Sequence, residues 1–359
     1  MEIDMSVVED EDDRMVVMPL GTMVQILWEH VERKFGENGT EGKGLIDVRF
    51  NHKVLTTGQD EGQAWVDVEI SSPSEAAQPK KVERLSAPYL IGCDGASSTV
   101  RHSLFGKSWP GQTWPCRFIV QNVYYAGFAT HAWDGGNYMV SPDHWGLIAK
   151  RGKTEQGDLW RVTYGDNEPN LTDEEYLTRR DWHFKHLLPG NPEPHEYVIE
   201  QTNLYNIHNR CAETFKVGRI LLAADAAHVC NPMGGYGCMT ACLDVDGLAD
   251  CLIGHHQGKA DSSILQTYSD IRREIFLKYV DARSIKNLDR VRKSDPWTVR
   301  DTDKFFGVLK DVTGDRQKLK DFLLKISSIE YDFTQHYHGG MKSNGMTNGA
   351  TANGAEIIT

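Results

Sequence analysis

The hydrophobic pattern of the first hundred residues predicts one helix followed by short strands. Apolar residues recur at helical spacing over residues 23–31, and Gly36 is expected to end this helix. Two strand-like runs at residues 45–50 and 65–70, joined by a polar connection, predict a hairpin or meander. A polar stretch that reads as a loop follows, and residues 89–93 then form a short apolar run that predicts a buried strand.

The pattern changes between residues 113 and 207. Short β-rich segments alternate there with Gly, Pro and Asp turns around one helix-like stretch at 173–187, which predicts a mainly antiparallel lobe. A second buried strand is expected at 218–224, followed by a glycine-rich loop and a helix near 238–253. Residues 262–287 give the strongest helical periodicity of the chain. The predicted fold class is α/β, with an antiparallel sheet lobe inserted into an α/β unit.

These changes in pattern divide the chain into five parts. We expect an acidic, disordered start (1–14), a discontinuous α/β unit (15–106 and 208–260), a β-rich lobe (107–207), C-terminal helices (261–337) and a disordered tail (338–359). The tail repeats Asn-Gly three times without an apolar pattern, which is typical of disorder.

Composition and charge exclude several classes of protein. With 40% hydrophobic and 25% charged residues, a chain of 359 residues can bury a large core. The net charge of −12 argues against a nucleic-acid binder, because phosphate contacts need a broad basic face. No secretory signal or membrane span is visible, and the seven scattered cysteines favour reduced thiols in a cytoplasmic protein.

The first of two strand-to-turn motifs runs from Tyr89 to Arg101. A buried strand delivers Asp94 and Gly95 to a turn, and hydroxyl residues then open a helix whose N–H groups point outward. This arrangement suits a helix N-terminus that faces a phosphorylated ligand. An ordinary strand, turn and capped helix explains the same residues equally well.

The second motif starts with the aliphatic run that ends at Asp225, where a carboxylate can hold a sugar hydroxyl. Three glycines within four positions, Gly234, Gly235 and Gly237, allow the backbone to approach a flat ligand closely. The helix that begins near Cys238 directs its positive end at that ligand. A glycine loop of purely structural origin is the less favoured alternative.

In this order and about 130 residues apart, the two motifs resemble those of the FAD-dependent aromatic hydroxylases. These single-component flavoprotein monooxygenases include the p-hydroxybenzoate and phenol hydroxylases. The resemblance covers roughly residues 15–300. It implies an FAD-dependent monooxygenase of a phenolic or polyketide-like small molecule, with NAD(P)H as reductant and O2 as oxidant. It also implies that the β-rich lobe is the substrate lobe, and a homodimer is a further expectation.

The resemblance assigns cofactor-binding roles by motif. The aspartate of the first motif helps to organise the FAD pyrophosphate, and that of the second binds the ribityl chain. The glycine loop lies beside the isoalloxazine ring, and two N–H groups at the start of its helix contact the flavin O2 edge. The residues implied in these roles are Asp94, Gly95, Asp225, Pro232, Gly235, Gly237, Cys238 and Met239.

One element of the family is not found in this sequence. Family members begin with a βαβ unit that carries Gly-x-Gly-x-x-Gly and holds the pyrophosphate, and residue 1 corresponds to a point roughly a hundred residues into such a protein. Two interpretations stay open. The chain is an incomplete copy of a larger flavoenzyme, or it is a shortened relative, flavin-free or inactive, that acts as a binding or non-redox module.

The catalytic residues are unknown from sequence, and the candidates are weak. Arg117 stands near the place where some relatives use an arginine to orient the substrate, and His228 follows the flavin aspartate closely. A lone histidine at a strand–loop junction is more often structural. In the β-rich lobe, Tyr138 or Trp145 could stack on a substrate ring and Arg151 could stabilise a phenolate, although a solvent-facing strand residue is the favoured interpretation for each. No metal-ligand cluster is recognisable.

Overall fold

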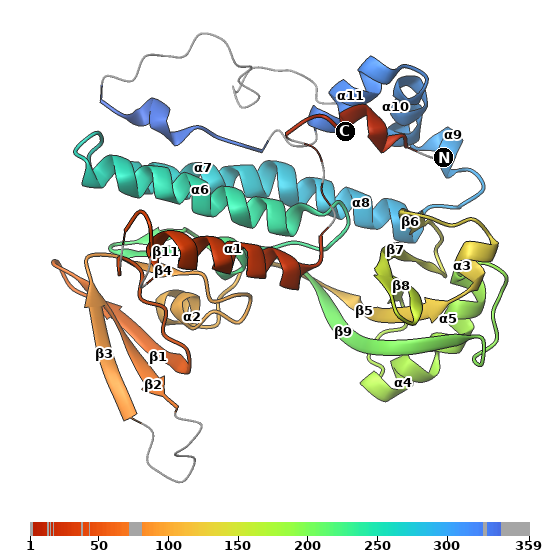
Figure 1. Ribbon diagram of the computed structural model, residues 1–359, viewed down its shortest axis with the longest axis horizontal. Helices are drawn as coiled ribbons and strands as arrows, with labels where there is room; N and C mark the ends of the chain where they lie inside the picture. Colours follow the sequence, from red (N-terminus) through yellow and green to blue (C-terminus); the bar gives the residue numbers. More distant parts are fainter. Residues whose placement is uncertain are drawn as a thin grey trace.

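The computed structural model describes residues 3–12, 14, 16, 18–36, 39–42, 44–71, 81–325 and 329–338. In these residues the backbone forms three β-sheets beneath a layer of long helices (Figure 1). Two small sheets lie under one end of the helical layer and a six-stranded sheet lies under the other. No helix of the described residues is long and apolar enough to cross a membrane.

The first small sheet is an antiparallel meander of β1 (His52–Gln59), β2 (Ala64–Ile70) and β3 (Lys81–Ala87). Its first turn is fixed by Asp60, whose Oδ1 accepts hydrogen bonds from the N–H groups of Gly62 (2.7 Å) and Gln63 (2.9 Å). The strand expected at residues 45–50 is wrong, because β1 starts at His52 and the earlier residues pair with no strand. The structure adds β3 in the stretch that reads as a loop.

The second small sheet has the order β10–β11–β4, from β10 (Lys216–Val217), β11 (Ile220–Leu222) and β4 (Leu90–Gly92). Strand β11 runs antiparallel to β10 and parallel to β4. All three residues of β11 are fully buried, which accounts for their uninterrupted aliphatic sequence. After β4 the chain enters helix α2 (Thr99–Phe105).

The large sheet is antiparallel and forms the β-rich lobe. Its order is β12–β9–β5–β8–β7–β6, from β12 (His228–Val229), β9 (Tyr197–Cys211), β5 (Gly111–Tyr125), β8 (Gly157–Asp166), β7 (Trp145–Thr154) and β6 (Gly136–Met139). Helices α3 (Gly127–Thr130), α4 (Asp173–Thr178) and α5 (Arg180–Leu187) accompany it. The single helix expected over residues 173–187 is therefore two helices, which meet at Arg179.

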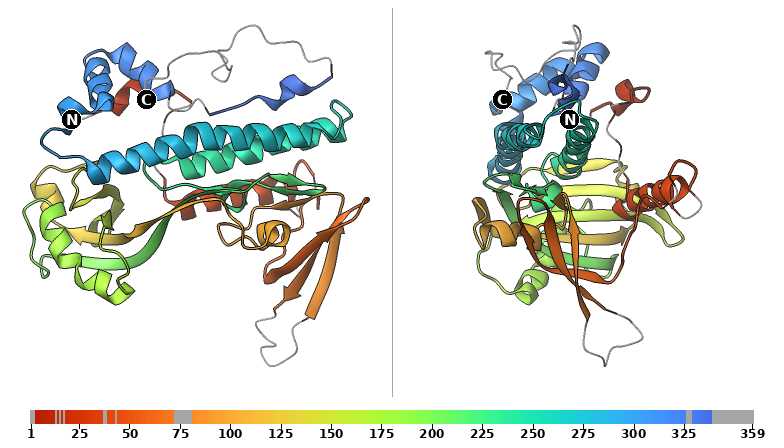
Figure 2. Two further views of the ribbon diagram at one scale, coloured as in Figure 1. Left: turned by 180° about the vertical axis from the view of Figure 1, so that it is seen from behind. Right: turned by 90° about the vertical axis from the view of Figure 1, so that its left-hand side faces the viewer.

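The helical layer is built from α6 (Tyr236–His256) and a second, longer run. That run is α7 (Ile264–Ile275), a π-helical segment η3 (Phe276–Asp281) and α8 (Ala282–Lys293), without a break. Helices α6 and α7 lie side by side in both Figure 1 and Figure 2, and their facing sides bury residues such as Leu248 and Tyr268. Along the chain, four further elements come after α8: α9 (Val299–Thr302), α10 (Lys304–Thr313), α11 (Arg316–Lys325) and η4 (Phe333–His336).

The beginning of the chain differs from the disordered start expected for residues 1–14. A short 3-10 helix, η1 (Met5–Val8), buries Val7 and Val8 against Leu319 of α11. Asp4 and Arg316 form an ion pair at 3.0 Å, so part of the acidic segment is neutralised by α11. These apolar and ionic contacts explain why the segment is folded. The tail expected at 338–359 lies outside the described residues except for His338.

Helix α1 (Leu20–Phe35) confirms the periodicity at residues 23–31, and it ends at Gly36, whose N–H bonds to the carbonyl of Glu32 (3.0 Å). None of its residues is fully buried. Its Met23 Sδ lies 3.9 Å from Cys238 Sγ, which brings α1 to the first turn of α6. All seven cysteines are free thiols.

Candidate active site

Strands β4 and β11 are hydrogen-bonded neighbours that run in the same direction, with Leu90 opposite Ile220 and Gly92 opposite Leu222. The two strand-to-turn motifs therefore belong to one sheet, as a single α/β unit built from residues 15–106 and 208–260 requires. Because the strands are parallel, the residues that follow them, Asp94 and Asp225, leave the sheet at the same edge. The carboxyl ends of parallel strands are where α/β sheets bind ligands.

The carboxylate of Asp94 is engaged by the helix that follows it. Its Oδ2 accepts hydrogen bonds from the N–H groups of Thr99 (2.7 Å) and Val100 (3.2 Å), and its Oδ1 accepts from the Ser98 hydroxyl. Asp94 therefore caps α2 and organises the turn, in which Gly95 has a φ of +80°. The first N–H groups of α2 therefore already have acceptors within the protein.

Arg101 connects the two motifs, a role that sequence reasoning did not assign to it. Its side chain is 1% exposed, and it donates hydrogen bonds to the carbonyls of Ala96 (2.6 Å) and Ala226 (3.0 Å). Its guanidinium carbon lies 3.5 Å from the ring centroid of Trp109. Burial lowers the pKa of Arg101 from its ordinary value. One buried cation thus fixes the Asp94 turn against the Asp225 turn.

Asp225 follows β11 within a short 3-10 turn, η2 (Ala224–Ala226), in which Ala224 has a φ of +57°. The residue is exposed, and among the described residues no donor hydrogen-bonds its carboxylate. Partial burial nevertheless raises the pKa of Asp225, while His228 acts in the opposite direction. An open carboxylate in a partly desolvated place suits a ligand hydroxyl, which would restore the missing hydrogen bonds.

A buried ionic network holds the Asp225 turn through the backbone of Ala224. Asp244 of α6 is 0% exposed and accepts hydrogen bonds from Arg272 Nε (2.8 Å), the N–H of Ala224 (3.1 Å) and, at 2.7 Å, His228 Nε2. Although burial alone would raise it, the His228 ring and the Arg272 guanidinium hold the pKa of Asp244 below its ordinary value. The His228 ring also stacks on Phe276, with ring centroids 4.2 Å apart.

The glycine loop leads into an uncapped helix N-terminus. Gly235, with a φ of +71°, precedes α6, and no side chain caps the helix. The first N–H groups of a helix have no acceptor within it, so those of Tyr236, Gly237 and Cys238 are available to a ligand. A Cβ added at Gly235 or Gly237 would meet nothing within 4 Å, which shows that the outer side of the loop is open.

The weak catalytic candidates lie away from this opening. Arg117 of β5 donates a hydrogen bond to Asp173 of α4 (2.9 Å), while its neighbours Cys116 and Phe118 face Met233 of the glycine loop. Side chains alternate along a strand, so Arg117 points to the opposite face of the sheet. His228 is 3% exposed and belongs to the Asp244 network.

In the β-rich lobe, Trp145 is 0% exposed and packs on Phe118, so it is a core residue. Tyr138 of β6, in contrast, is brought to the glycine loop. Its side chain is 52% exposed, and partial desolvation of the phenol raises its pKa, an effect that the nearby backbone of Gly234 opposes and the Tyr236 phenol adds to. Tyr138 is thus the aromatic candidate of the lobe that lies beside Gly234.

These features fit the flavin end of FAD. An open Asp225 carboxylate leaves the sheet edge after β11, and the chain then passes through glycines without steric obstruction into the uncapped N-terminus of α6. Together they can accept a hydroxylated chain, a negatively charged ring edge and a flat ring.

Comparison with known proteins agrees with this class of site. The model of the family described as FAD binding domain matches residues 14–283, and the chain belongs to that family. Among individual proteins, the chain is 37% identical over 285 residues to para-nitrophenol 4-monooxygenase from Pseudomonas sp. (strain WBC-3), covering 79% of this chain and 66% of that protein. It is 34% identical over 213 residues to 6-hydroxy-3-succinoylpyridine 3-monooxygenase from Pseudomonas putida, covering 58% and 51%.

The fold is also found among solved structures. The crystal structure of p-nitrophenol 4-monooxygenase PnpA from Pseudomonas putida DLL-E4 superimposes with a TM-score of 0.75 at 30% identity, covering 91% of this chain and 77% of that one. Aklavinone-11 hydroxylase in a ternary complex with FAD and aklavinone gives a TM-score of 0.55 at 24% identity, covering 68% and 44%. The chain spans half to two thirds of the length of the two curated relatives.

Proposed function

We propose that this chain belongs to an FAD-dependent monooxygenase that hydroxylates a phenolic small molecule, with NAD(P)H as reductant and O2 as oxidant. The observation that carries the proposal is the shared edge of β4 and β11, where the open Asp225 carboxylate is followed along the chain by a glycine loop and the uncapped N-terminus of α6. Its relatives include monooxygenases whose names specify nitrophenol and a hydroxylated pyridine, which supports an aromatic substrate.

The division of labour at this site follows from the residues. FAD, when bound, supplies the redox chemistry with oxygen. The Asp225 carboxylate accepts hydrogen bonds from hydroxyl groups of the cofactor chain, and the N–H groups at the start of α6 stabilise negative charge at the ring edge. Asp94 and Arg101 act indirectly by fixing the two turns, and the Asp244 network holds the backbone N–H of Ala224.

The substrate side of the proposal rests on the β-rich lobe. Tyr138 lies beside Gly234, where its ring can pack against an aromatic substrate and its hydroxyl can hydrogen-bond a phenolic oxygen. A cytoplasmic location is part of the proposal and is supported by the seven free thiols. A homodimer stays a prediction.

The proposal is tested by titrating the protein with FAD. Binding is monitored by the visible spectrum and by the quenching of flavin fluorescence. Asp225→Ala removes a hydrogen bond to a charged group, which contributes about 1.5–3 kcal/mol, so we expect FAD affinity to fall about 10- to 100-fold. Asp246→Ala is the matched control, because this exposed carboxylate lies on α6, ten residues after Tyr236. Equal affinity of parent and Asp225→Ala would place any bound flavin elsewhere.

The same titration distinguishes the alternative class. If neither parent nor variant gives a bound-flavin spectrum at high FAD concentration, the chain by itself acts as a flavin-free binding module. A variant in the β-rich lobe tests the proposed substrate contact. In a flavin-binding enzyme, Tyr138→Phe is expected to raise the KM for a phenol several-fold and to leave FAD affinity unchanged.

A further inference from the structure

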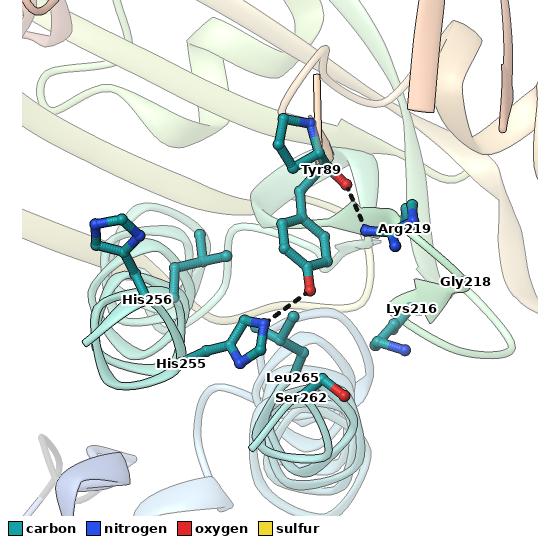
Figure 3. Close-up of a pocket in the computed structure, with 10 residues that line it drawn as sticks. Tyr89, Lys216, Gly218, Arg219, His255, His256, Ser262 and Leu265 are labelled. Carbon is teal, nitrogen blue, oxygen red and sulfur yellow. Dashed lines mark hydrogen bonds between the residues drawn. The ribbon is translucent and has the colours of Figure 1, made fainter. Parts of the chain in front are cut away.

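A cavity of about 950 Å³ opens at the side of the small sheet opposite to the candidate active site. It is bordered by Tyr89, which precedes β4, by Lys216 and Arg219 of the β10–β11 hairpin, and by the end of α6 and the start of α7 (Figure 3). These residues precede or begin the parallel strands, whereas Asp94 and Asp225 follow them. The cavity is therefore distinct from the flavin opening.

The lining of this cavity is basic in an acidic protein. Its basic groups are Lys216, Arg219, His255 and His256, and none of its ten lining residues is Asp or Glu, although the chain carries 51 acids against 39 bases. Two carboxylates that act electrostatically on the lining residues Arg219 and His255 are hydrogen-bonded in local turns. Asp60 accepts from the N–H groups of the β1–β2 turn, and Asp261 accepts from the N–H of Ser263 (2.8 Å).

Several donors in the cavity lack a protein partner. Among the described residues nothing hydrogen-bonds or ion-pairs with the Lys216 ammonium or the Ser262 hydroxyl. His255 Nε2 lies 3.2 Å from the Tyr89 hydroxyl, but its Nδ1 is buried without an acceptor. Figure 3 shows Lys216 of the hairpin and Ser262, which lies just before α7, toward the hydroxyl end of Tyr89. A buried, unpaired polar atom is costly unless a ligand satisfies it.

Arg219 supplies positive charge from a fixed position. Its guanidinium donates to the carbonyls of Glu61 (2.6 Å) and Pro88 (3.2 Å) and lies 5.7 Å from the ring centroid of Tyr89. Its hydrogen bonds go to carbonyl groups, and the Asp60 carboxylate, which is held by the β1–β2 turn, acts on it only through space. Leu252 and Leu265 add an apolar part to the lining between α6 and α7. The cavity thus combines an apolar surface with two cations.

We propose that this cavity is a binding site for an organic acid, a small aromatic carboxylate, separate from the flavin site. The carboxylate pairs with Lys216 and the charge of Arg219, with a hydrogen bond from Ser262, and the ring packs on Tyr89 and the leucines. The volume lies at the upper end of that expected for small-molecule sites.

The experiment is a calorimetric titration of the purified full chain with benzoate, at neutral pH and with and without FAD. We expect benzoate to bind, inorganic phosphate to bind at least ten-fold more weakly because it lacks the apolar part, and benzylamine not to bind because its charge is inverted. Lys216→Gln is expected to weaken benzoate about 10- to 100-fold, and Ser262→Ala about 2- to 10-fold. Lys216→Arg keeps the charge and should retain most of the affinity.

Two controls locate the site. Lys259→Gln removes a cation that lies near the end of α6 but outside the lining, so benzoate affinity should not change. Tyr138→Phe alters the proposed substrate side and should also leave it unchanged, which separates this site from the proposed substrate site. The proposal is overturned if benzoate does not bind at millimolar concentration, if phosphate binds as tightly, or if Lys216→Gln binds benzoate like the parent.

Discussion

Replacing Asp244 with Asn tests how much of the site depends on one buried carboxylate. The side chain is 0% exposed and accepts from three donors, of which one belongs to the cation Arg272 and one is the N–H of Ala224. The amide keeps the shape but removes the negative charge and turns one acceptor into a donor. The Arg272 guanidinium, itself 1% exposed, is then left without its counter-ion.

The magnitude follows from that geometry. Breaking a buried ion pair by removing one partner costs about 3–5 kcal/mol, because the remaining charge stays desolvated. We therefore expect the free energy of unfolding in urea to fall by about that amount. Because Ala224 and Asp225 are adjacent, FAD affinity should fall as well. Asp246→Asn, an exposed carboxamide on the same helix, is the control and should change stability by less than about 0.5 kcal/mol.

The pH dependence gives a second measurement of the same network. The folded pKa of Asp244 is depressed, so its stabilising contribution is fully present above the ordinary aspartate value near about 4 and is lost as pH falls through the lower folded value. The difference in stability between parent and Asp244→Asn should therefore be constant near neutral pH and shrink in acid. A loss for Asp244→Asn no larger than that for Asp246→Asn would refute the reasoning.

Three further predictions concern other parts of the structure. Arg101→Met removes the hydrogen bond to Ala226 and should destabilise the chain by about 2–4 kcal/mol in a urea titration; a change under 1 kcal/mol would show that the two turns are held otherwise. Gly234→Ala should be destabilising in thermal unfolding by about 1–3 kcal/mol, because its Cβ would lie 2.5 Å from the Tyr236 ring at a φ of +116°. Burial first, and then neighbouring histidines, lower the pKa of His144 to about 4, so stability should decline as pH falls from about 6.5 towards that value, and His144→Phe should flatten this decline; an unchanged pH profile would contradict it.

Local chemistry made the sheet edge predictable from sequence. A short aliphatic run that stops at an aspartate is typical of a buried strand that ends in a turn. Two such runs can pair in parallel, because the long segment between them provides the crossover that parallel strands need. The strand expected at residues 45–50 failed for the opposite reason. Its apolar residues suit a strand, but the pairing is decided by register with β2, where Gln59 and Ala64 close a turn fixed by Asp60.

The buried charges were missed because a single charged residue in a helix is usually exposed. The helical periodicity nevertheless indicates which charged residues are buried. Asp244 lies on the same helical face as Leu248 and Cys251, and Arg272 lies on the face of Tyr268 and Ile275, all of them buried. Opposite charges on the apolar faces of two successive helices indicate an interhelical ion pair in the core.

The run from α7 through η3 to α8 behaves as a single rod that rests on both halves of the molecule. Its first part packs into the core beneath α6 through Tyr268, and its last part packs against the β-rich lobe through Leu288. The lobe and the sheet edge therefore cannot change their mutual angle without bending or sliding this rod. The π-helical turn departs from regular α-helical hydrogen bonding, which makes it the most compliant point. Phe276 begins that turn and stacks on His228, which joins the rod to the Asp244 network that holds the Asp225 turn.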